Sequence, residues 1–400
     1  MNKEIARHLE AIKENSVDLI SEEELITKIK NSLNKKKPLK LKIGFDPTAS
    51  DIHLGHTVLL RKLRRLQDLG HQVYFIIGDF TAKIGDPSQR TALRPILSDK
   101  EIKANAATYT NQAFKILDKS KTKVIYNSIW YKNMPLSKFL SLLSSYTLAR
   151  ILERDDFSQR LKEGRPLTLL EVTYPLIQGY DSYKLEADIE FGGTDQKFNL
   201  IVGRRLQQAF GQVSQAIVTM PILVGLDGKN KMSKSLDNYI GITDKPKEMF
   251  GKIMSISDEV MWEYFRLLTD YDVQGMKEIH PKQAKLKLAE NIVSFYYSAE
   301  KAKKEKKEFE KVFSEGKLPQ DILIHPSGPR ASIITVLSSA KIVSSKNEAR
   351  RLLSQGAISF VNPEDFSQTT AKQDEFNVSV QGEILKIGKK KFLKIVLKNS

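Results

Sequence analysis

The sequence predicts an α/β fold: a doubly wound parallel sheet in the first half of the chain, then an α-helical region, then a small α+β domain. Three observations support this expectation. As far as about residue 225, short apolar runs of strand length alternate with segments of helical periodicity. Beyond Asp237, helix-forming residues dominate. A stretch rich in glycine and proline, residues 315–330, then sets off a basic C-terminal segment.

The first strand–helix–strand unit is the clearest part of the pattern. The apolar run 41–45 is followed by a polar loop and then by apolar residues at helical spacing, which Gly70 ends before a second apolar run at 73–78. Such a βαβ unit implies a parallel sheet with a right-handed crossover. In doubly wound folds, ligands bind at the carboxyl ends of the strands, so the loop 46–56 is a candidate binding site.

The alternation of strands and helices continues to about residue 225. Ser98 and Glu101 have the spacing of a capping box, which predicts a helix running from there to about Leu117. The remaining expected elements are a strand at 124–127, helices near 135–153 and 167–184, a strand at 188–191 and a helix after Gly193. With the helical region at 245–314 and the linker after it, the expected domains are 1–237, 238–325 and 326–400.

Composition narrows the class of protein. The chain has 400 residues, a formal charge of +16 and no cysteine. The lack of cysteine excludes disulfides, cysteine-ligated zinc and a thiol nucleophile. The positive charge favours a polyanionic partner such as nucleic acid, although a merely basic soluble protein has the same composition. We expect a cytoplasmic protein without a membrane segment, because neither a secretory signal nor a long apolar window is present.

The segment GFDPTASDIHLGH, residues 44–56, carries the first chemical motif. His53 and His56 stand where a strand passes into a helix, so their imidazoles and the free N–H groups of the helix face the same region, which suits a phosphate. Gly55 between them would let a flat adenine approach the backbone. Two alternatives are a pair of packing or capping histidines and a metal site, for which the loop offers no obvious third ligand.

The segment LDGKNKMSKSLDN, residues 226–238, carries the second motif. Its glycines allow the loop to move, and Lys229, Lys231 and Lys234 could close over a triphosphate and stabilise charge on it. Taken alone, the segment is more typical of a solvated basic loop.

A third pattern lies in the predicted helix 167–184. Tyr174, Gln178 and Asp181 follow one another at i, i+4 and i+7, which places them on one side of the helix, where they could face one ligand. The alternative is a packed tyrosine, a capping glutamine and an aspartate paired with a surface lysine.

Together these motifs resemble a known enzyme class. HLGH in an early βαβ turn and the later KMSKS are the signature pair of class I aminoacyl-tRNA synthetases. Within that class, the segments GFDPTA, IGDPS, YPLIQGYDS and GGTDQKFNL resemble tyrosyl-tRNA synthetases specifically, over nearly the whole chain. The resemblance implies a Rossmann-like catalytic domain, a helical anticodon-binding region and an S4-like RNA-binding domain.

The resemblance also implies an activity and its partners. The expected enzyme activates L-tyrosine with ATP to give tyrosyl-adenylate and pyrophosphate, and then transfers the tyrosyl group to the 3′-terminal adenosine of tRNA(Tyr). Mg²⁺ would accompany the ATP phosphates, no protein-bound metal is expected, and the enzyme would be a homodimer. Two rivals remain: a tryptophanyl-tRNA synthetase, which shares the fold and both signatures, and an RNA-binding protein that keeps the frame without activity.

Individual residues receive roles by the same resemblance. Asp181 would bind the phenolic hydroxyl of tyrosine, and Asp86, Tyr174 and Gln178 its α-ammonium. The remaining residues expected at tyrosine are Asp46 and Gln196. The residues expected at ATP are Gly55, Gly193, Asp195, Lys231, Met232, Ser233, Lys234, Ser235, Arg90 and Arg94. Catalysis by charge stabilisation is expected from Thr48, His53, His56, Lys231 and Lys234.

One position departs from the better-known branch of the family. There, a tyrosine two residues ahead of the GFD glycine is a second partner for the substrate hydroxyl, whereas this chain has Lys42. Hydroxyl recognition would then rest on Asp181 alone or be supplemented from elsewhere.

The C-terminal segment resembles an S4-type RNA-binding domain. Between residues 330 and 400, 12 Lys and Arg face 6 Asp and Glu. Ser345 and Glu348 have capping-box spacing, Arg350 and Arg351 would project from the resulting helix, and Gly356 would end it. A basic helix of this kind suits structured RNA, and the alternative is a basic packing helix.

Overall fold

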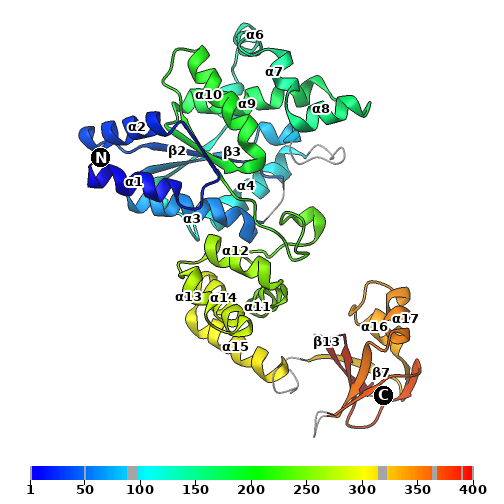
Figure 1. The fold of residues 1–400 in the computed structure, drawn as a ribbon. Coiled ribbons are helices and arrows are strands. Elements are labelled where there is room, and N and C mark those ends of the chain that lie inside the picture. Colours follow the sequence, from blue (N-terminus) through cyan, green and yellow to red (C-terminus); the bar gives the residue numbers. More distant parts are fainter. Residues whose placement is uncertain are drawn as a thin grey trace. The chain divides into compact units, whose positions relative to one another are not determined.

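The computed structural model describes residues 2–48, 51–87, 97–313, 322–362, 367–388 and 391–398. It forms two compact units, residues 1–298 and 299–400 (Figure 1). The helical segment that follows Asp237 belongs to the first unit as far as Ser298. The division into three domains after residues 237 and 325 stays a prediction.

The first unit is built on a six-stranded sheet in the order β1-β6-β5-β2-β3-β4. The strands from β2 to β6 run parallel, and the short β1 is antiparallel to β6 at the edge. Their bounds are β1 Asp18–Ile20, β2 Lys40–Phe45, β3 Gln72–Ile77, β4 Thr122–Tyr126, β5 Ile189–Gly193 and β6 Ala216–Met220. The chain winds outwards from β2 through β3 to β4 and returns to place β5 on the other side of β2, so the strand order reverses between β2 and β5.

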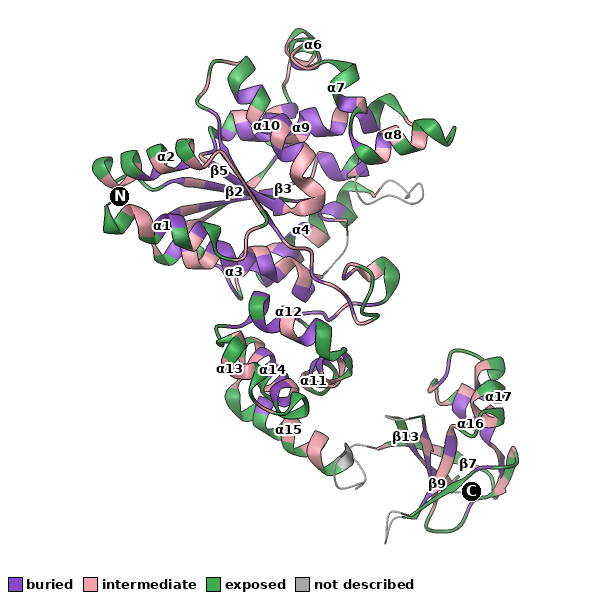
Figure 2. Cartoon of the chain, viewed as in Figure 1, coloured by how far each residue is buried: buried purple, intermediate pink, exposed green. Residues whose placement is uncertain are grey.

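Helices cover both faces of this sheet. Figure 1 shows α9 and α10 on one side and α1 and α3 on the other. The central strands β2, β3, β5 and β6 are mostly buried, whereas the edge strands β1 and β4 are only partly covered (Figure 2). The helices before β6 are α1 Lys3–Lys13, α2 Glu22–Lys35, α3 Leu54–Asp68, α4 Asp99–Ala113, α5 Ser128–Tyr131, α6 Leu136–Ser144, α7 Leu148–Leu152, α8 Asp155–Lys162, α9 Leu169–Leu185 and α10 Lys197–Ala209. The predicted α/β fold is confirmed.

The helices agree with the predicted pattern except where local hydrogen bonding interrupts it. The Ser98–Glu101 capping box is present at the start of α4, but the helix ends at Ala113 and not near Leu117. The helix expected near 135–153 is two helices, because Thr147 accepts a hydrogen bond from the Arg150 amide and so begins α7 anew. The strand β6, which no predicted element covered, is buried along its whole length.

Four further helices complete the first unit: α11 Pro246–Ser255, α12 Asp258–Leu268, α13 Val273–Lys277 and α14 Pro281–Tyr296. They confirm the helical character predicted after Asp237. Arg61 on α3 pairs with Asp270, which follows α12: its guanidinium lies 3.2 Å from the carboxylate.

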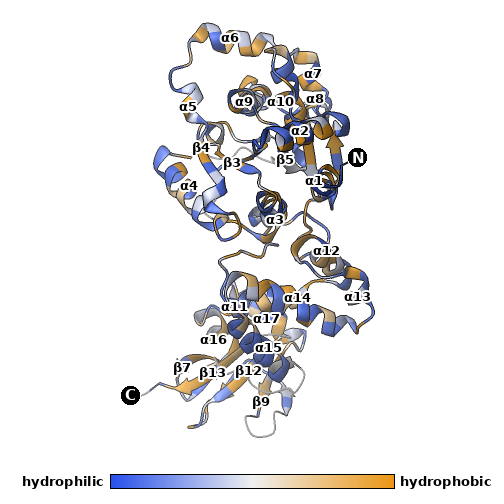
Figure 3. Ribbon diagram, turned by 90° about the vertical axis from the view of Figure 1, so that its left-hand side faces the viewer, coloured by the Kyte–Doolittle hydropathy of each residue, from blue (hydrophilic) through white to orange (hydrophobic). Residues whose placement is uncertain are grey.

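The second unit begins with α15 Ala299–Phe313, which is hydrophilic along most of its length in Figure 3. It then forms a five-stranded sheet in the order β10-β9-β12-β13-β7 and a two-stranded ribbon of β11 and β8. The bounds are β7 Leu323–Ser327, β8 Arg330–Ser332, α16 Ile333–Ser339, α17 Lys346–Ser354, β9 Ile358–Val361, β10 Gln368–Thr370, β11 Glu375–Asn377, β12 Glu383–Ile387 and β13 Lys391–Leu397. This is the small α+β architecture that the sequence predicts.

Two local predictions in the second unit are corrected in part. The segment 315–330 is not a linker throughout, because β7 pairs in parallel with β13. At the start of α17, Ser345 accepts a hydrogen bond from the Glu348 amide as expected. The Glu348 carboxylate, however, accepts its hydrogen bond from the Ser344 amide and not from the Ser345 amide. Gly356, at φ +65°, follows the helix as predicted.

Within the part of the chain that the structure describes, no helix is both long enough and apolar enough to cross a membrane.

Candidate active site

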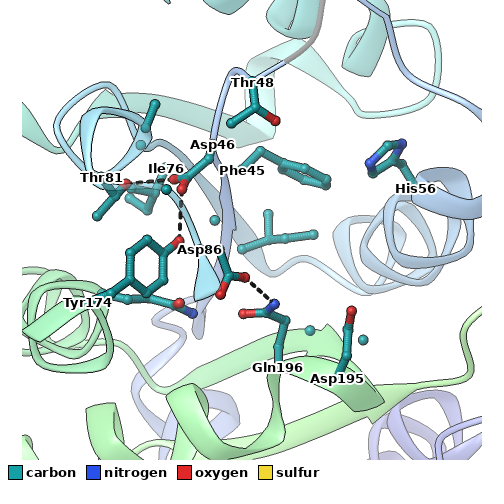
Figure 4. A pocket seen from close by; sticks show the side chains of 18 of the residues that line it. Phe45, Asp46, Thr48, His56, Ile76, Thr81, Asp86, Tyr174, Asp195 and Gln196 are labelled. Carbon is teal, nitrogen blue, oxygen red and sulfur yellow. Dashed lines mark hydrogen bonds between the residues drawn. The ribbon is translucent and has the colours of Figure 1, made fainter. Parts of the chain in front are cut away.

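A cavity of about 780 Å³ opens at the carboxyl ends of β2 and β5, where the strand order reverses (Figure 4). Its walls come from the loop after β2, from α9, from the turn after β5 and from the segment 221–235. Segments far apart in the sequence therefore meet at one site. The predicted site residues that line this cavity are Asp46, Thr48, His53, Gly55, His56, Asp86, Tyr174, Gln178, Asp181, Gly193, Asp195, Gln196, Lys231, Met232, Ser233 and Ser235.

The two histidines lie at the start of α3. His53 is the N-cap of the helix, its amide donates to Nδ1 of His56 at 3.3 Å, and the two ring centroids are 3.9 Å apart. Burial lowers the pKa of His56 to about 4. Burial, and to a smaller extent the neighbouring His56, holds the pKa of His53 well below its usual value. Both imidazoles are therefore neutral at pH 7, and each can donate only one N–H.

The backbone of Gly55 lies close to the side chains of His53 and Met232. A Cβ on Gly55 would lie 3.0 Å from Nδ1 of His53 and 3.6 Å from Cβ of Met232. Nδ1 of His53 is buried and has no hydrogen-bond partner within the described ranges. A buried polar atom of this kind at the wall of a cavity is suited to a bound group.

The other end of the cavity presents the polar side of α9. Tyr174, Gln178 and Asp181 all line it, as their spacing predicts. The hydroxyl of Tyr174 donates to Asp46 at 2.8 Å, and the hydroxyl of Thr81 donates to the other oxygen of that carboxylate at 2.6 Å. Burial raises the pKa of Asp46 to about 7, against the effect of these two hydrogen bonds. A cationic ligand group at this position would favour the ionised carboxylate.

Asp181 is held by three donors. Nε1 of Trp130 donates to one oxygen at 2.8 Å, Nδ2 of Asn127 donates to the other at 3.2 Å, and the hydroxyl of Tyr131 lies 3.3 Å from the first. Burial raises the pKa of Asp181 to about 6, and the positive charge of Lys42 is the strongest opposing influence. The carboxylate is thus fixed in position at the cavity wall, and its burial makes ionisation less favourable than in water.

The turn after β5 carries the residues between the two ends. A Cβ on Gly193 would lie 2.7 Å from Oδ1 of Asp195, so any larger residue there would displace the Asp195 carboxylate. Nε2 of Gln196 donates to Asp86 at 2.6 Å. The side chain of Asn199 donates to Gln178 at 3.0 Å and to Gln196 at 3.1 Å, and so ties α9 to α10 beneath the cavity.

The lysine-rich loop lies at the open side of the cavity. Nζ of Lys231 is 3.4 Å from Asp195, and Nζ of Lys234 is 2.6 Å from Asp51. Asn238 braces the loop by accepting from the Ser233 amide at 2.8 Å and donating to the Lys231 carbonyl at 3.0 Å. Each of these two lysines therefore already pairs with a carboxylate from a neighbouring segment.

Three predicted residues stand apart from the rest. Lys234 contacts Asp51 and is not among the cavity-lining residues of the described chain. Arg90 and Arg94 lie outside the described residues. No group of three or more His, Asp or Glu side chains with the geometry of a metal site occurs within the described ranges.

Sequence reasoning missed the residues that orient the predicted ones. Asn127, Trp130 and Tyr131 hold Asp181, and Asn199 holds the two glutamines. Asn127 could have been predicted, because it is the last residue of the predicted strand 124–127 and polar residues at the carboxyl end of a parallel strand face the ligand edge. The others depend on how helices pack, which spacing along the sequence does not give.

Comparison with known proteins agrees with this geometry. A model of the family described as tRNA synthetases class I (W and Y) matches residues 34–315. The tyrosine–tRNA ligase of Aquifex aeolicus is 48% identical over 394 residues, covering 97% of this chain and 98% of that protein. The tyrosine–tRNA ligase of Thermotoga maritima is 46% identical, covering 96% of each chain.

Solved structures agree at the level of the fold. A tyrosyl-tRNA synthetase from Archaeoglobus fulgidus, complexed with L-tyrosine, has a TM-score of 0.61 at 24% identity and covers 76% of this chain and 99% of that one. A truncated mitochondrial tyrosyl-tRNA synthetase from Aspergillus nidulans has a TM-score of 0.62 at 20% identity and covers 78% of this chain and 95% of that one.

The fold and the family match define the class: the chain belongs to the class I aminoacyl-tRNA synthetases of the tryptophan and tyrosine type. Within that class, its nearly full-length relatives place it in the tyrosyl-tRNA synthetase family. The tryptophanyl alternative and the inactive RNA-binding frame therefore lose their support.

Proposed function

We propose that this enzyme activates L-tyrosine with ATP and then esterifies it to the 3′-terminal adenosine of tRNA(Tyr). One observation carries the proposal: a single cavity joins a histidine- and lysine-lined end with a carboxylate- and tyrosine-lined end. The first end suits phosphates and the second suits an amino acid with a hydroxyl on its side chain. The two reactants would then meet between them.

In the first step, the tyrosine carboxylate attacks the α-phosphorus of ATP in line, and pyrophosphate leaves. No protein side chain needs to become covalently attached, so the enzyme's contribution is positioning and charge stabilisation. Neutral His53 and His56 would donate hydrogen bonds to the phosphate oxygens, with Thr48 beside them at the cavity wall. Lys231 and Lys234 would exchange their present carboxylate partners for the departing pyrophosphate.

In the nucleotide half, Gly55 and Gly193 would admit the adenosine, and Asp195 would accept the ribose hydroxyls. Met232, Ser233 and Ser235 line the same wall. Resemblance alone gives Arg90 and Arg94 their role at the pyrophosphate. The nucleotide substrate is MgATP, in which the ion is carried by the phosphates; we assign no side chain as its ligand.

In the tyrosine half, Asp181 would accept the phenolic hydroxyl, and Asp46, Asp86, Tyr174, Gln178 and Gln196 would surround the α-ammonium and the tyrosyl group. A buried carboxylate that requires a hydroxyl partner disfavours phenylalanine, which would leave it unsatisfied; this enzyme family is the standard example of that effect. In the second step, a hydroxyl of the terminal adenosine attacks the carbonyl of the adenylate, and AMP leaves.

The second unit is proposed to bind tRNA as an S4-like domain. Arg350 and Arg351 are exposed on α17, as a phosphate contact requires. The proposed anticodon-binding role of the helical region rests on resemblance.

We further propose a homodimer that works in the cytoplasm, where ATP and tRNA are available together. Large apolar side chains are exposed on α5, α6, α7 and the start of α9, and a homodimer interface would cover them. They are Ile129, Leu136, Leu140, Leu148, Leu169 and Leu170.

The test is formation of an aminoacyl ester on tRNA from labelled tyrosine, phenylalanine or tryptophan. Charging with tyrosine alone supports the proposal. Charging with tryptophan would reassign the amino-acid end of the cavity, and no charging with any of the three would remove the second step.

A further inference from the structure

The departure at position 42 leads to a buried ion pair behind the amino-acid end of the cavity. Lys42 on β2 and Glu190 on β5 are register partners on neighbouring central strands. Nζ of Lys42 lies 2.8 Å from Oε1 of Glu190, and both side chains are 1% exposed. Burying an ion pair to this degree carries a large desolvation cost. Removing one partner would leave the other charge buried and uncompensated.

Lys42 uses all its hydrogen-bonding capacity on α9 and β5. Besides Glu190, its ammonium donates to the backbone carbonyl of Gln178 at 3.0 Å and to the hydroxyl of Ser182 at 2.7 Å. An ammonium group has three donors, and these three partners occupy them. Lys42 also does not line the cavity as the described residues define it. It therefore cannot replace a tyrosine by donating directly to the substrate hydroxyl.

The contacts of Lys42 lie on either side of Asp181 along α9. Gln178 is one turn before Asp181, and Ser182 is the next residue. The hydroxyl of Ser182 donates onwards to Oε2 of Glu190 at 2.9 Å. Gly203 on α10 packs closely against this network: a Cβ there would lie 3.0 Å from Oγ of Ser182 and 3.2 Å from Oε2 of Glu190. The turn of α9 that carries Asp181 is thus fixed against β2 and β5 by one ammonium group.

We propose that Lys42 is a positioning residue that determines specificity: it fixes Asp181 against the sheet and supplies the positive charge that keeps this carboxylate ready to accept a phenolic hydroxyl. In this chain, the buried Lys42 ammonium group acts on Asp181 through α9 and takes the place of a second hydrogen-bond partner for the substrate hydroxyl. The inference rests on the proposed tyrosine specificity and deepens it.

The charges around Asp181 determine the direction in which its pKa should move when Lys42 is replaced. Lys42 on β2 favours its ionised form, and Glu190 on β5 opposes it. Asp46, Tyr174 and Tyr131 also interact with it electrostatically, from the loop after β2, from α9 and from α5. Because burial raises the pKa of Asp181 to about 6, a lost positive charge would bring its protonation into the neutral range.

Two variants separate charge from packing. Lys42→Met combined with Glu190→Gln replaces the pair by neutral side chains of similar size, so that no lone charge is buried. Glu190→Gln alone removes the anion and keeps the cation, whose ammonium retains the Gln178 carbonyl and the Ser182 hydroxyl as acceptors. Lys40→Met is the matched control, because Lys40 also lies on β2 and donates to the Leu185 carbonyl at the end of α9, at 3.0 Å. A merely structural role would make both Glu190 variants change in the same direction.

The measurement is kcat/KM in pyrophosphate exchange with tyrosine and with phenylalanine between pH 5 and 9, with circular dichroism as a check on folding. For the neutral double variant, we expect the part of the acid limb that Asp181 sets, which lies below the part set by Asp46, to move to higher pH and the tyrosine-to-phenylalanine ratio to fall. At a pH below this limb, kcat/KM for tyrosine should fall about tenfold for each pH unit by which the limb moves. For Glu190→Gln alone, we expect the limb to move to lower pH and the ratio to be kept. Lys40→Met should match the wild type.

An unchanged ratio and profile in the folded double variant would overturn the proposal, and so would a shift of both variants in the same direction. If the double variant does not fold, Glu190→Gln alone decides: a limb that stays in place or moves to higher pH contradicts the role of Lys42. A wild-type enzyme without tyrosine-dependent exchange is a different result, because it would remove the proposed function itself.

Discussion

At the scale of single residues, Asp46 shows how burial prepares a binding group. Its carboxylate is enclosed with Thr81 and Tyr174 as hydrogen-bond donors, and burial raises its pKa to about 7. The group is therefore half protonated near neutral pH before a ligand arrives. A bound ammonium group would favour the ionised form and lower this pKa again.

Tyrosine affinity should therefore depend on pH. It should be fully present at about one pH unit or more above the pKa of Asp46, which is about 7, and fall as the pH drops through that pKa, by up to about tenfold per unit. Trp130, which donates to Asp181, offers an intrinsic fluorescence signal for the titration without ATP. In Asp46→Asn the decline should begin nearer pH 6, where Asp181 titrates. Constant affinity of the wild type from pH 8 to 6 would exclude this role of Asp46.

His53→Ala and Lys234→Met should lower the rate of activation and leave tyrosine binding nearly intact. Each removes one group that acts on the phosphates, for which losses of roughly 10²–10³ in kcat are typical. Pre-steady-state adenylate formation gives the rate, and equilibrium dialysis gives the tyrosine affinity. Lys245→Met is the control, because Lys245 is exposed a few residues after the same loop, is not among the described residues that line the cavity, and should have little effect. An equal loss of tyrosine affinity in the two variants would contradict their assignment to the phosphate end.

The candidate site was predictable where contacts follow the sequence. Tyr174, Gln178 and Asp181 share one side of a helix because of their spacing, and that placement is confirmed. The partners Trp130 and Asn199 were not predictable, because they reach the site through helix packing. The pairing of Lys42 with Glu190 also lay beyond the sequence, since a lysine in an apolar strand gives no sign of its partner.

At the scale of elements, the close approach of α9 and α10 holds the site together. A Cβ on Gly179 would lie 2.8 Å from Cδ1 of Leu206 and 3.0 Å from the backbone of Gly203. Because two of these atoms belong to the backbone, the helices would have to separate to admit a methyl group. Gly179 thus sets the distance at which Asn199 can reach Gln178.

Gly179→Ala should destabilise the first unit by about 1–3 kcal/mol, as overpacking in a close contact does. Gly251→Ala is the matched control, since Gly251 also lies within a helix and a Cβ there meets nothing within 4 Å. That change should be neutral or stabilising by about 1 kcal/mol, from helix propensity alone. Urea denaturation measures both, and equal effects would mean that the α9–α10 contact is looser than described.

Elements were predictable to the extent that their periodicity is long enough to see. The strands β2, β3, β4 and β5 follow from apolar runs, whereas β1 has only three residues and pairs antiparallel at the sheet edge. The strand β7 was not predicted, because its proline and flanking glycine are typical of a linker. It nevertheless pairs in parallel with β13. Tertiary pairing overrides local propensity in such cases.

At the scale of the whole molecule, a buried histidine pair links stability to pH. The Leu39 amide donates to Nδ1 of His71 at 3.3 Å, so Nε2 of His71 carries the proton and donates to Nδ1 of His8 at 2.9 Å. Burial lowers the pKa of His71 to about 4 and also lowers that of His8. The pair joins α1 to the strands of the sheet.

Stability should therefore fall in mild acid. A histidine whose folded pKa is lowered stabilises the fold above its unfolded pKa near 6.5, and this contribution is lost as the pH falls towards 4. The slope is roughly 1.4 kcal/mol per pH unit for each histidine. Thermal unfolding from pH 7.5 to 4.5 measures it, and His71→Gln should flatten the dependence. A variant as acid-sensitive as the wild type would assign the effect to other groups.

Replacing both Arg350 and Arg351 by Gln should weaken tRNA charging without changing amino-acid activation. Loss of two phosphate contacts should lower kcat/KM for tRNA by about tenfold at moderate salt and reduce the salt dependence. Parallel assays of charging and of pyrophosphate exchange separate the two steps. An unaffected charging rate would argue against the proposed RNA-binding role of α17.

The measurement that tests the central claim most directly is amino-acid-dependent exchange of pyrophosphate into ATP without tRNA, with tyrosine, phenylalanine and tryptophan compared. The cavity predicts rapid exchange with tyrosine and very little with the other two, because only tyrosine brings a hydroxyl to Asp181. Exchange with tryptophan, or equal exchange with phenylalanine, would contradict the assignment of that carboxylate. No exchange with any of the three would contradict the activation step itself.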